Sequence, residues 1–299
     1  MSSGLADLHR HLDGSVRPAT LQALAAAAGT SVPDDLCFTP GMGLEAALLR
    51  FSFTLSLLQA PGTVARVASE ICEDAVEEGV TTLEIRFAPQ LHRGGRLGEV
   101  VDAALEGIAG RAGLILCALY GEPPALVDAL VDTAAPRPGV VGIDLAGGPV
   151  LGHRWGMADY AQPFARAAEV GLGRTVHAGE GRPVDEIRTA IEVLGAQRIG
   201  HGLTVLDDPS VASMVRDRGI TLEACPTSNW QVGAIENIAA HPLPQWLDQG
   251  LRACINTDNT LLSDVDAAEE ARRVLQIPGM DLARIDRATA FGHTAAFAR

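Results

Sequence analysis

The sequence predicts an α/β protein, a (β/α)8 or TIM barrel with extra helices after the first strand. Three observations support this fold class. Eight short runs of β-type composition alternate with segments of helical periodicity, the chain has 299 residues, and 47% of them are apolar. Parallel strands joined by helices produce such an alternation, eight strands close a barrel, and a single barrel commonly reaches this length.

The strands are predicted from apolar and β-branched runs that are bounded by glycine, proline or polar residues. In chain order they span residues 5–13, 81–89, 113–121, 139–147, 173–180, 197–205, 220–228 and 251–259. An open doubly wound sheet is the alternative, but no GxGxxG motif follows the first run to support nucleotide binding there.

Helical periodicity appears between the runs. It is clearest in residues 63–79, 99–113, 183–195 and 207–219. Pro209 suits the start of the last of these helices, and Gly79, Gly195 and Gly219 suit the ends of three of them. The stretch 14–80 is longer than one connecting helix needs, which predicts extra helices there.

No linker rich in proline, glycine or serine divides the chain, so residues 1–299 are predicted to form one domain. The formal net charge of −14 argues against nucleic acid or an anionic membrane as a partner. The five cysteines have no paired spacing, and neither a leader nor an apolar run of about 18 residues is seen. These features predict a cytoplasmic protein.

All 23 basic residues are arginine. Mechanisms that need a lysine, such as a Schiff base, a Walker-type phosphate loop or a carbamylated metal bridge, are therefore excluded.

Polar residues recur where the predicted strands end. Since the active site of a (β/α)8 barrel lies at the carboxyl ends of its strands, these residues are expected to meet. They are His9, His11 and Asp13 in the first run, Gly147 in the fourth, His177 and Glu180 in the fifth, His201 in the sixth, Ser228 in the seventh, and Asp258 and Asn259 in the eighth.

One subset matches a metal site. His9 and His11 are two residues apart and project from the same face of a strand. With His177 and Asp258 they offer three imidazole nitrogens and one carboxylate, which suits zinc with an open position for water. Glu180 and His201 remain for proton transfer, as metal-assisted hydrolysis requires.

Each residue also has a structural alternative when it is taken singly. His177 and His201 could be core histidines bonded to backbone carbonyls, Glu180 a surface acid, and Asp258 a helix N-cap. The other histidines are expected to lie at the surface or make local hydrogen bonds, and Cys225 is expected to be a buried small residue. These other histidines are His92, His153, His241 and His293.

The motifs that carry these residues resemble the adenosine deaminases of the amidohydrolase superfamily. In the family's order, they are LHRHLDGSVRPATL (8–21), EIRFAPQLH (84–92), VVGIDLAG (140–147), TVHAGE (175–180), RIGHGL (198–203), ACPTSN (224–229) and NTDN (256–259). They extend over nearly the whole chain.

The resemblance implies one zinc ion per chain, held by His9, His11, His177 and Asp258. It implies three catalytic residues, Glu180, His201 and Asp258. It assigns substrate binding to His11, Asp13, Gly147 and Asn259, with Ser228 supporting His201. Glu180 would protonate N1 of the purine, His201 would position or deprotonate the attacking water, and Asp13 would contact the ribose 5′-hydroxyl.

The reaction so implied is hydrolytic deamination of adenosine or deoxyadenosine to inosine or deoxyinosine and ammonia, a step of purine salvage. Glu180 must then be protonated when substrate binds, so burial is expected to raise its pKa.

The chain departs from the family pattern twice. Asn259 replaces the second of two aspartates, and GGP at 147–149 replaces the more usual GDE. The substrate could therefore be another 6-aminopurine, either adenine or a 5′-modified adenosine such as aminodeoxyfutalosine. An inactive purine-binding relative is a further alternative. The oligomeric state is left open. Residues 48–58 are read either as a lid over the sugar side or as ordinary core.

Overall fold

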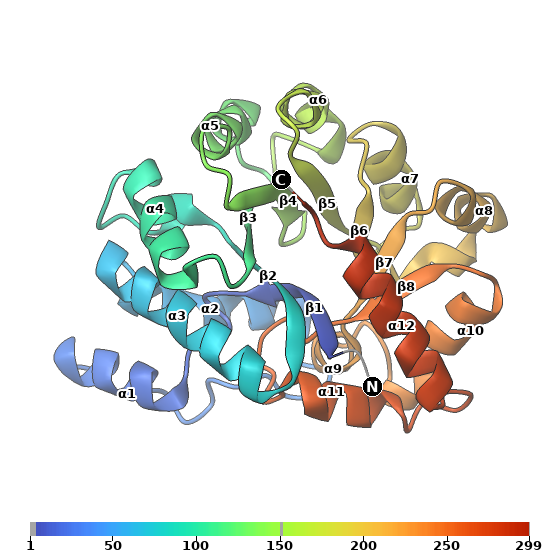
Figure 1. Ribbon diagram of the computed structural model, residues 1–299, viewed down its shortest axis with the longest axis horizontal. Coiled ribbons are helices and arrows are strands. Elements are labelled where there is room, and N and C mark those ends of the chain that lie inside the picture. The colour runs from blue at the N-terminus through green and yellow to red at the C-terminus, as the bar shows by residue number, and fades with distance from the viewer. Residues whose placement is uncertain (1–3, 150–151, 299) are drawn as a thin grey trace.

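A computed structural model describes residues 4–149 and 152–298. In these residues, eight parallel strands stand in the order β1 to β8, and helices surround them as an outer layer (Figure 1). The strands are β1 (Leu5–His11), β2 (Val80–Phe87), β3 (Gly113–Leu119), β4 (Val140–Ala146), β5 (Gly173–Ala178), β6 (Arg198–His201), β7 (Thr221–Ala224) and β8 (Arg252–Ile255). A parallel bridge between Arg10 and Asp258 joins the last strand's end to the first, which confirms the predicted (β/α)8 barrel.

Helices connect successive strands. They are α1 (Pro18–Ala27), α2 (Leu44–Leu57), α3 (Pro61–Glu77), α4 (Leu97–Ile108), α5 (Pro124–Ala134), α6 (Ala161–Glu169), α7 (Asp185–Glu192), α8 (Pro209–Asp217), α9 (Pro226–Gln231), α10 (Leu243–Asp248), α11 (Ala267–Val274) and α12 (Leu282–Ala295). The extra helices predicted after the first strand are α1 and α2, which lie with α3 on one side of the barrel (Figure 1).

Local chemistry explains several of these boundaries. Asp208 caps α8 by accepting a hydrogen bond from the Ser210 amide, and Pro209 follows it as predicted. The helix predicted over residues 99–113 ends earlier, at Ile108, because Ala109 and Gly110 adopt left-handed backbone conformations. The predicted strands end later than the observed ones. The predicted ranges include the polar site residues, which in the structure follow the last paired residue of each strand.

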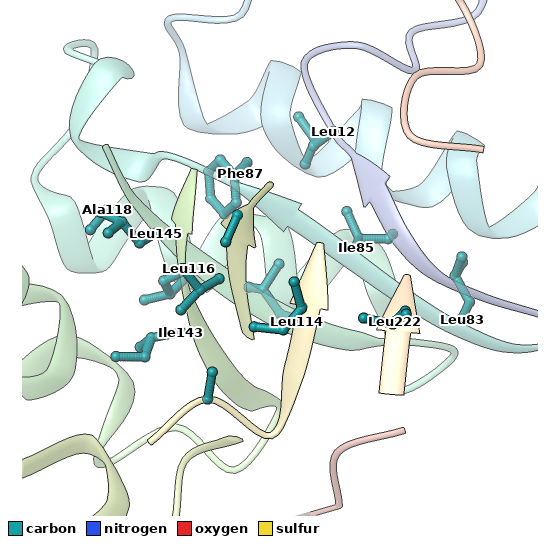
Figure 2. Close-up of a cluster of buried hydrophobic side chains, with 14 of the residues drawn as sticks. Leu12, Leu83, Ile85, Phe87, Leu114, Leu116, Ala118, Ile143, Leu145 and Leu222 are labelled. Atoms are coloured by element: carbon teal, nitrogen blue, oxygen red, sulfur yellow. The ribbon is translucent and has the colours of Figure 1, made fainter. Parts of the chain in front are cut away.

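The main hydrophobic core lies between the strands and the helices. On β2, Leu83, Ile85 and Phe87 are every second residue, and all three are buried (Figure 2). The same alternation on β3 and β4 adds Leu114, Leu116, Ala118, Ile143 and Leu145 to this layer.

The alternate residues face the barrel interior, and many of them are charged. We call five of these residues, all buried, the interior charge cluster: Glu84, Arg86, Asp144, Arg198 and Glu223.

No helix among the described residues is both long and apolar enough to cross a membrane.

Candidate active site

The structure brings the predicted metal ligands together. The Nε2 atom of His11 lies 3.3 Å from the Nε2 atoms of both His9 and His177. Asp258 Oδ1 lies 3.5 Å from His9 Nε2 and 3.4 Å from His11 Nε2. Ligand atoms bonded tetrahedrally to zinc at about 2.0–2.1 Å are separated by about 3.3–3.4 Å. The side chains are therefore spaced as a bound metal ion requires.

Buried carboxylates orient two of the imidazoles. Glu223 Oε2 accepts a hydrogen bond from His9 Nδ1 at 2.7 Å, and Asp144 Oδ2 lies 3.0 Å from His177 Nδ1. Each contact directs the Nε2 lone pair of its histidine toward the cluster, which is how carboxylates commonly support metal-binding histidines. The sequence analysis missed both acids, although each interrupts an apolar run of a predicted strand.

The interior charge cluster holds these acids ionised. Arg86 lies 2.9 Å from both Asp144 and Glu223, and Arg198 Nε lies 2.7 Å from Glu223. Burial would raise the pKa of both acids, but their neighbours lower it: the His177 imidazole and the Arg86 guanidinium for Asp144, and the Arg86 and Arg198 guanidinium groups for Glu223.

Glu180 is buried in the same pocket, beyond the end of β5. Burial, followed by the negative charge of Asp258, raises the pKa of Glu180 to about 8. This confirms the expected direction, so the side chain is a carboxylic acid at neutral pH. Its burial removes the surface-acid alternative.

His201 lies 3.6 Å from Glu180, measured from Nδ1 to Oε1. Burial lowers the pKa of His201 well below its ordinary value, so its imidazole is neutral. Asn229 Nδ2 donates a hydrogen bond to His201 Nδ1 at 2.9 Å, which leaves the ring proton on Nε2. Ser228 lines the pocket beside this pair, whereas Asn229 was missed by the sequence analysis.

Two of the site residues have unusual backbone conformations. His201 has a φ of 64° and Asp258 a φ of 62°, and such left-handed values are uncommon outside glycine. Asp258 is held in place by β1, since its amide donates to His9 O and its carbonyl accepts from the His11 amide, both at 2.8 Å. A turn follows Asp258, so it is not the N-cap of a helix.

The pocket around these groups is lined by residues from several elements. They are His11, Phe38, Leu44, Ala47, Leu48, Phe51, Gly147, His177, Glu180, His201, Ser228, Val232, Asp258 and Asn259. We call it the inner pocket. Four of the lining residues belong to α2, and the Phe51 ring centroid lies 6.2 Å from that of His11. The segment 48–58 thus covers the site while it also packs against the core.

Asp13 lies outside the inner pocket, in an adjoining chamber. Burial raises the pKa of Asp13 to about 7. Asp13 Oδ1 is buried without a hydrogen-bond partner among the described residues, as expected of a group that awaits a ligand, whereas Asn259 Oδ1, also without such a partner, packs against Gly14.

Gly14 has a role that the sequence did not reveal. A Cβ atom on Gly14 would lie 2.0 Å from Asn259 Oδ1, so any larger residue would displace Asn259. The close approach of Asn259 therefore requires glycine at this position.

The remaining histidines lie apart from this cluster. His92 Nδ1 donates to Leu58 O, His241 Nδ1 accepts from the Leu243 amide, and His293 contacts Thr82 and Gly4, so local hydrogen bonds are confirmed for these three. His92 and His241 are buried and meet the expectation through these hydrogen bonds, and His153 meets it through its exposed position.

Cys225 is buried as expected, and burial raises the pKa of its thiol well above the ordinary value. Its sulfur lies within 4.8 Å of ligand atoms of His9 and Asp258.

A (β/α)8 barrel with this cluster at the carboxyl ends of its strands defines the class of amidohydrolase-type enzymes. Comparisons with known proteins identify the family within this class. The model of the adenosine deaminase family matches residues 4–299. An adenosine deaminase of Enterococcus faecalis is 35% identical over 283 residues, covering 88% of this chain and 83% of that protein. The chain belongs to the adenosine deaminase family and is a hydrolytic deaminase.

Two solved structures share the fold. Adenine deaminase from Arthrobacter aurescens aligns with a TM-score of 0.90 and 26% identity, over 99% of this chain and 94% of that one. An amidohydrolase from Burkholderia ambifaria with bound Zn aligns with a TM-score of 0.86 and 23% identity, over 100% and 86% of the two chains.

Proposed function

We propose that the protein catalyses the zinc-dependent deamination of adenosine and deoxyadenosine to inosine and deoxyinosine, with release of ammonia, as a step of purine salvage in the cytoplasm. The observation that carries the proposal is Glu180, a buried acid that stays protonated at neutral pH beside a cluster of potential metal ligands. Membership of the family supports it.

The residues fit a single zinc ion. His9, His11, His177 and Asp258 would hold it, because their donor atoms converge at the spacing of a tetrahedral site. When bound, zinc lowers the pKa of water toward neutrality and so supplies a nucleophile.

Glu180 and His201 have different roles in the proposed reaction. Glu180 donates its proton to N1 of the purine, which makes C6 electrophilic, and water adds to C6 before ammonia leaves. His201 is neutral and carries its ring proton on Nε2, so it can donate a hydrogen bond that positions the water oxygen. Asp258, besides binding the metal, can accept a proton from the same water and pass it to the C6 amino group, which then leaves as ammonia.

Three further residues orient the nucleoside. Asn259 can donate its side-chain amide to the acceptor N7 of the purine, and the Gly147 backbone lies in the same pocket, where its amide can reach N3. His11 lines both the inner pocket and the adjoining chamber, and Asp13 lines that chamber, where it can bind the ribose 5′-oxygen. Adenine lacks a ribose and cannot use the Asp13 contact.

The test is a substrate panel with zinc-loaded protein, followed by the change in ultraviolet absorbance. We expect kcat/KM for adenosine and deoxyadenosine to be similar and about 100-fold above that for adenine, because adenine leaves the buried Asp13 carboxyl without a partner. A preference for adenine would contradict the nucleoside assignment. Zinc binding without turnover of any aminopurine would favour the inactive purine-binding alternative.

A further inference from the structure

A cavity of about 510 Å³ lies at the end of the barrel opposite to the active site. The first residues of four strands line it: Gly173 of β5, Arg198 of β6, Thr221 of β7 and Arg252 of β8. Residues 294–298 add a further wall as they run from α12 toward β4 and β5 (Figure 1). We call this space the basal cavity. It shares no described residue with the inner pocket or with the chamber that adjoins that pocket.

The lining of the basal cavity is basic, although the chain as a whole is acidic. Acidic residues outnumber basic ones in the chain, 37 to 23, yet three arginines and no aspartate or glutamate line this cavity among the described residues. The arginines are Arg174, Arg198 and Arg252. A cavity of similar size beside α1, about 480 Å³, has the opposite lining, in which acids outnumber Arg17. The positive lining is therefore particular to the basal cavity.

The three arginines differ in how their charges are balanced. The guanidinium of Arg198 contacts Glu84 and Glu223 of the interior charge cluster, so its charge is compensated inside the barrel. Arg174 and Arg252 form no ion pair among the described residues, and their side-chain hydrogen bonds go to uncharged oxygens. Two uncompensated positive charges therefore remain at the basal cavity.

Neutral contacts hold these two guanidinium groups in place. Arg174 Nε donates a hydrogen bond to Gly195 O, and Arg252 Nη2 donates one to Thr294 Oγ1, both at 2.9 Å. Arg252 Nε is buried without a hydrogen-bond partner among the described residues. Burial lowers the pKa of Arg174, because no acid offsets the lost hydration. A partly buried charge with unused donors is costly unless a ligand supplies the missing partner.

The donors around the basal cavity suit phosphate groups. A guanidinium binds phosphate through two parallel N–H···O contacts, and both uncompensated arginines keep N–H groups for such contacts. Gln197 adds a further donor, because its Oε1 accepts from the Arg174 amide at 3.2 Å and leaves the side-chain NH2 to donate.

The separation of the two arginines indicates a ligand with two anionic ends. Arg174 lies on β5 and Arg252 on β8, so three strand spacings, roughly 14 Å in all, separate their backbones. A volume of about 510 Å³ is that of a small-molecule site rather than of a single ion. We propose that the basal cavity binds a small molecule of the sugar bisphosphate class, with one phosphate at Arg174 and the other at Arg252. This inference does not rest on the proposed function, because it concerns the opposite end of the barrel.

Calorimetry on the full chain with fructose 1,6-bisphosphate, fructose 6-phosphate and inorganic phosphate tests the inference. We expect the bisphosphate to bind at least about tenfold more tightly than the monophosphate, because it gains one further charge-assisted contact. Inorganic phosphate should bind no more tightly than the monophosphate. Equal affinities for the bisphosphate and the monophosphate, or for the bisphosphate and the free ion, would overturn the inference.

Three variants locate the binding. Arg174→Gln and Arg252→Gln each remove one of the two phosphate contacts, so in either variant the bisphosphate should bind no more than about twofold more tightly than the monophosphate. Arg93 is exposed and does not line the cavity, so Arg93→Gln should keep the preference of about tenfold. A preference that survives in both cavity variants, or that falls equally in Arg93→Gln, would contradict the assignment of the basal cavity.

The melting temperature separates a binding role of the two arginines from a structural one. Neither arginine pairs with an acid, so both cavity variants should melt close to the wild type, and a fall of more than about 10 °C in both would overturn the inference. Arg252→Lys keeps the positive charge and should retain a preference for the bisphosphate above about threefold, whereas a complete loss would contradict an electrostatic contact. Turnover of adenosine reports on the proposed function alone, so the two proposals can fail independently.

Discussion

The inner pocket and the interior charge cluster differ in how their buried charges are balanced. In the cluster, each charged group faces an opposite charge: Arg86 lies between Asp144 and Glu223, and Arg198 contacts Glu84 as well as Glu223. In the pocket, Asp258 is surrounded by histidines, and the acid of Glu180 is kept neutral by burial.

This difference in charge balance indicates that the interior charge cluster supports the site structurally, whereas the inner pocket carries out the chemistry. Paired charges in the cluster hold fixed positions, and through Glu223 and Asp144 they orient two of the imidazoles of the proposed metal site. The polar groups of the inner pocket keep lone pairs and protons that a ligand can use, and two of their residues have strained backbone conformations. A substitution of a pocket residue that does not bind the metal should therefore affect turnover alone, whereas one in the cluster should also affect folding and metal affinity.

The largest effect on turnover is expected for Glu180→Gln, because glutamine keeps the shape but cannot transfer a proton. We expect kcat/KM for adenosine to fall by about 10³-fold, with the melting temperature and the metal content retained. Steady-state kinetics and metal analysis test this. Wild-type turnover by the variant would contradict the role of Glu180 as the acid.

Glu223→Gln tests the cluster side of the comparison. Loss of one buried negative charge leaves Arg86 and Arg198 undercompensated, and we expect stability to fall by about 3–5 kcal/mol and zinc affinity by about 10–100-fold. Denaturant unfolding and competition with a chelator measure the two losses. Glu106 is an exposed acid of α4, and Glu106→Gln should change neither quantity.

The pH profile follows from the raised pKa of Glu180. The acid form is the active one, and a pKa of about 8 keeps it populated at neutral pH. We expect kcat/KM to fall as pH rises through about 8, by about tenfold for each further pH unit. A fall that begins near the ordinary glutamic acid pKa would show that burial does not protect this proton.

The smallest effect is expected for Asn229→Ala. The variant removes the hydrogen bond that fixes the His201 ring, so we expect kcat to fall by about tenfold while zinc content stays constant. Loss of zinc from this variant would place Asn229 with the metal-supporting residues instead.

The sequence predicted the barrel and the residues at its strand ends because both rest on short-range patterns. Alternating apolar runs mark strands, and His9, His11, Glu180 and Asp258 stand where those runs end. Residues whose roles depend on contacts with distant parts of the chain could not be predicted from the sequence. Glu223 contacts His9 across 214 positions, and no local pattern distinguishes it from any other acid in a strand.

Metal content tests the central claim most directly. Wild-type protein loaded with zinc and passed through a desalting column should retain one ion per chain, and His177→Ala should retain much less. His153→Ala replaces an exposed histidine that is not one of the proposed ligands, and it should retain one ion. Wild-type protein that retains no zinc, or an equal content in all three proteins, would contradict the assignment of His9, His11, His177 and Asp258 as the metal site.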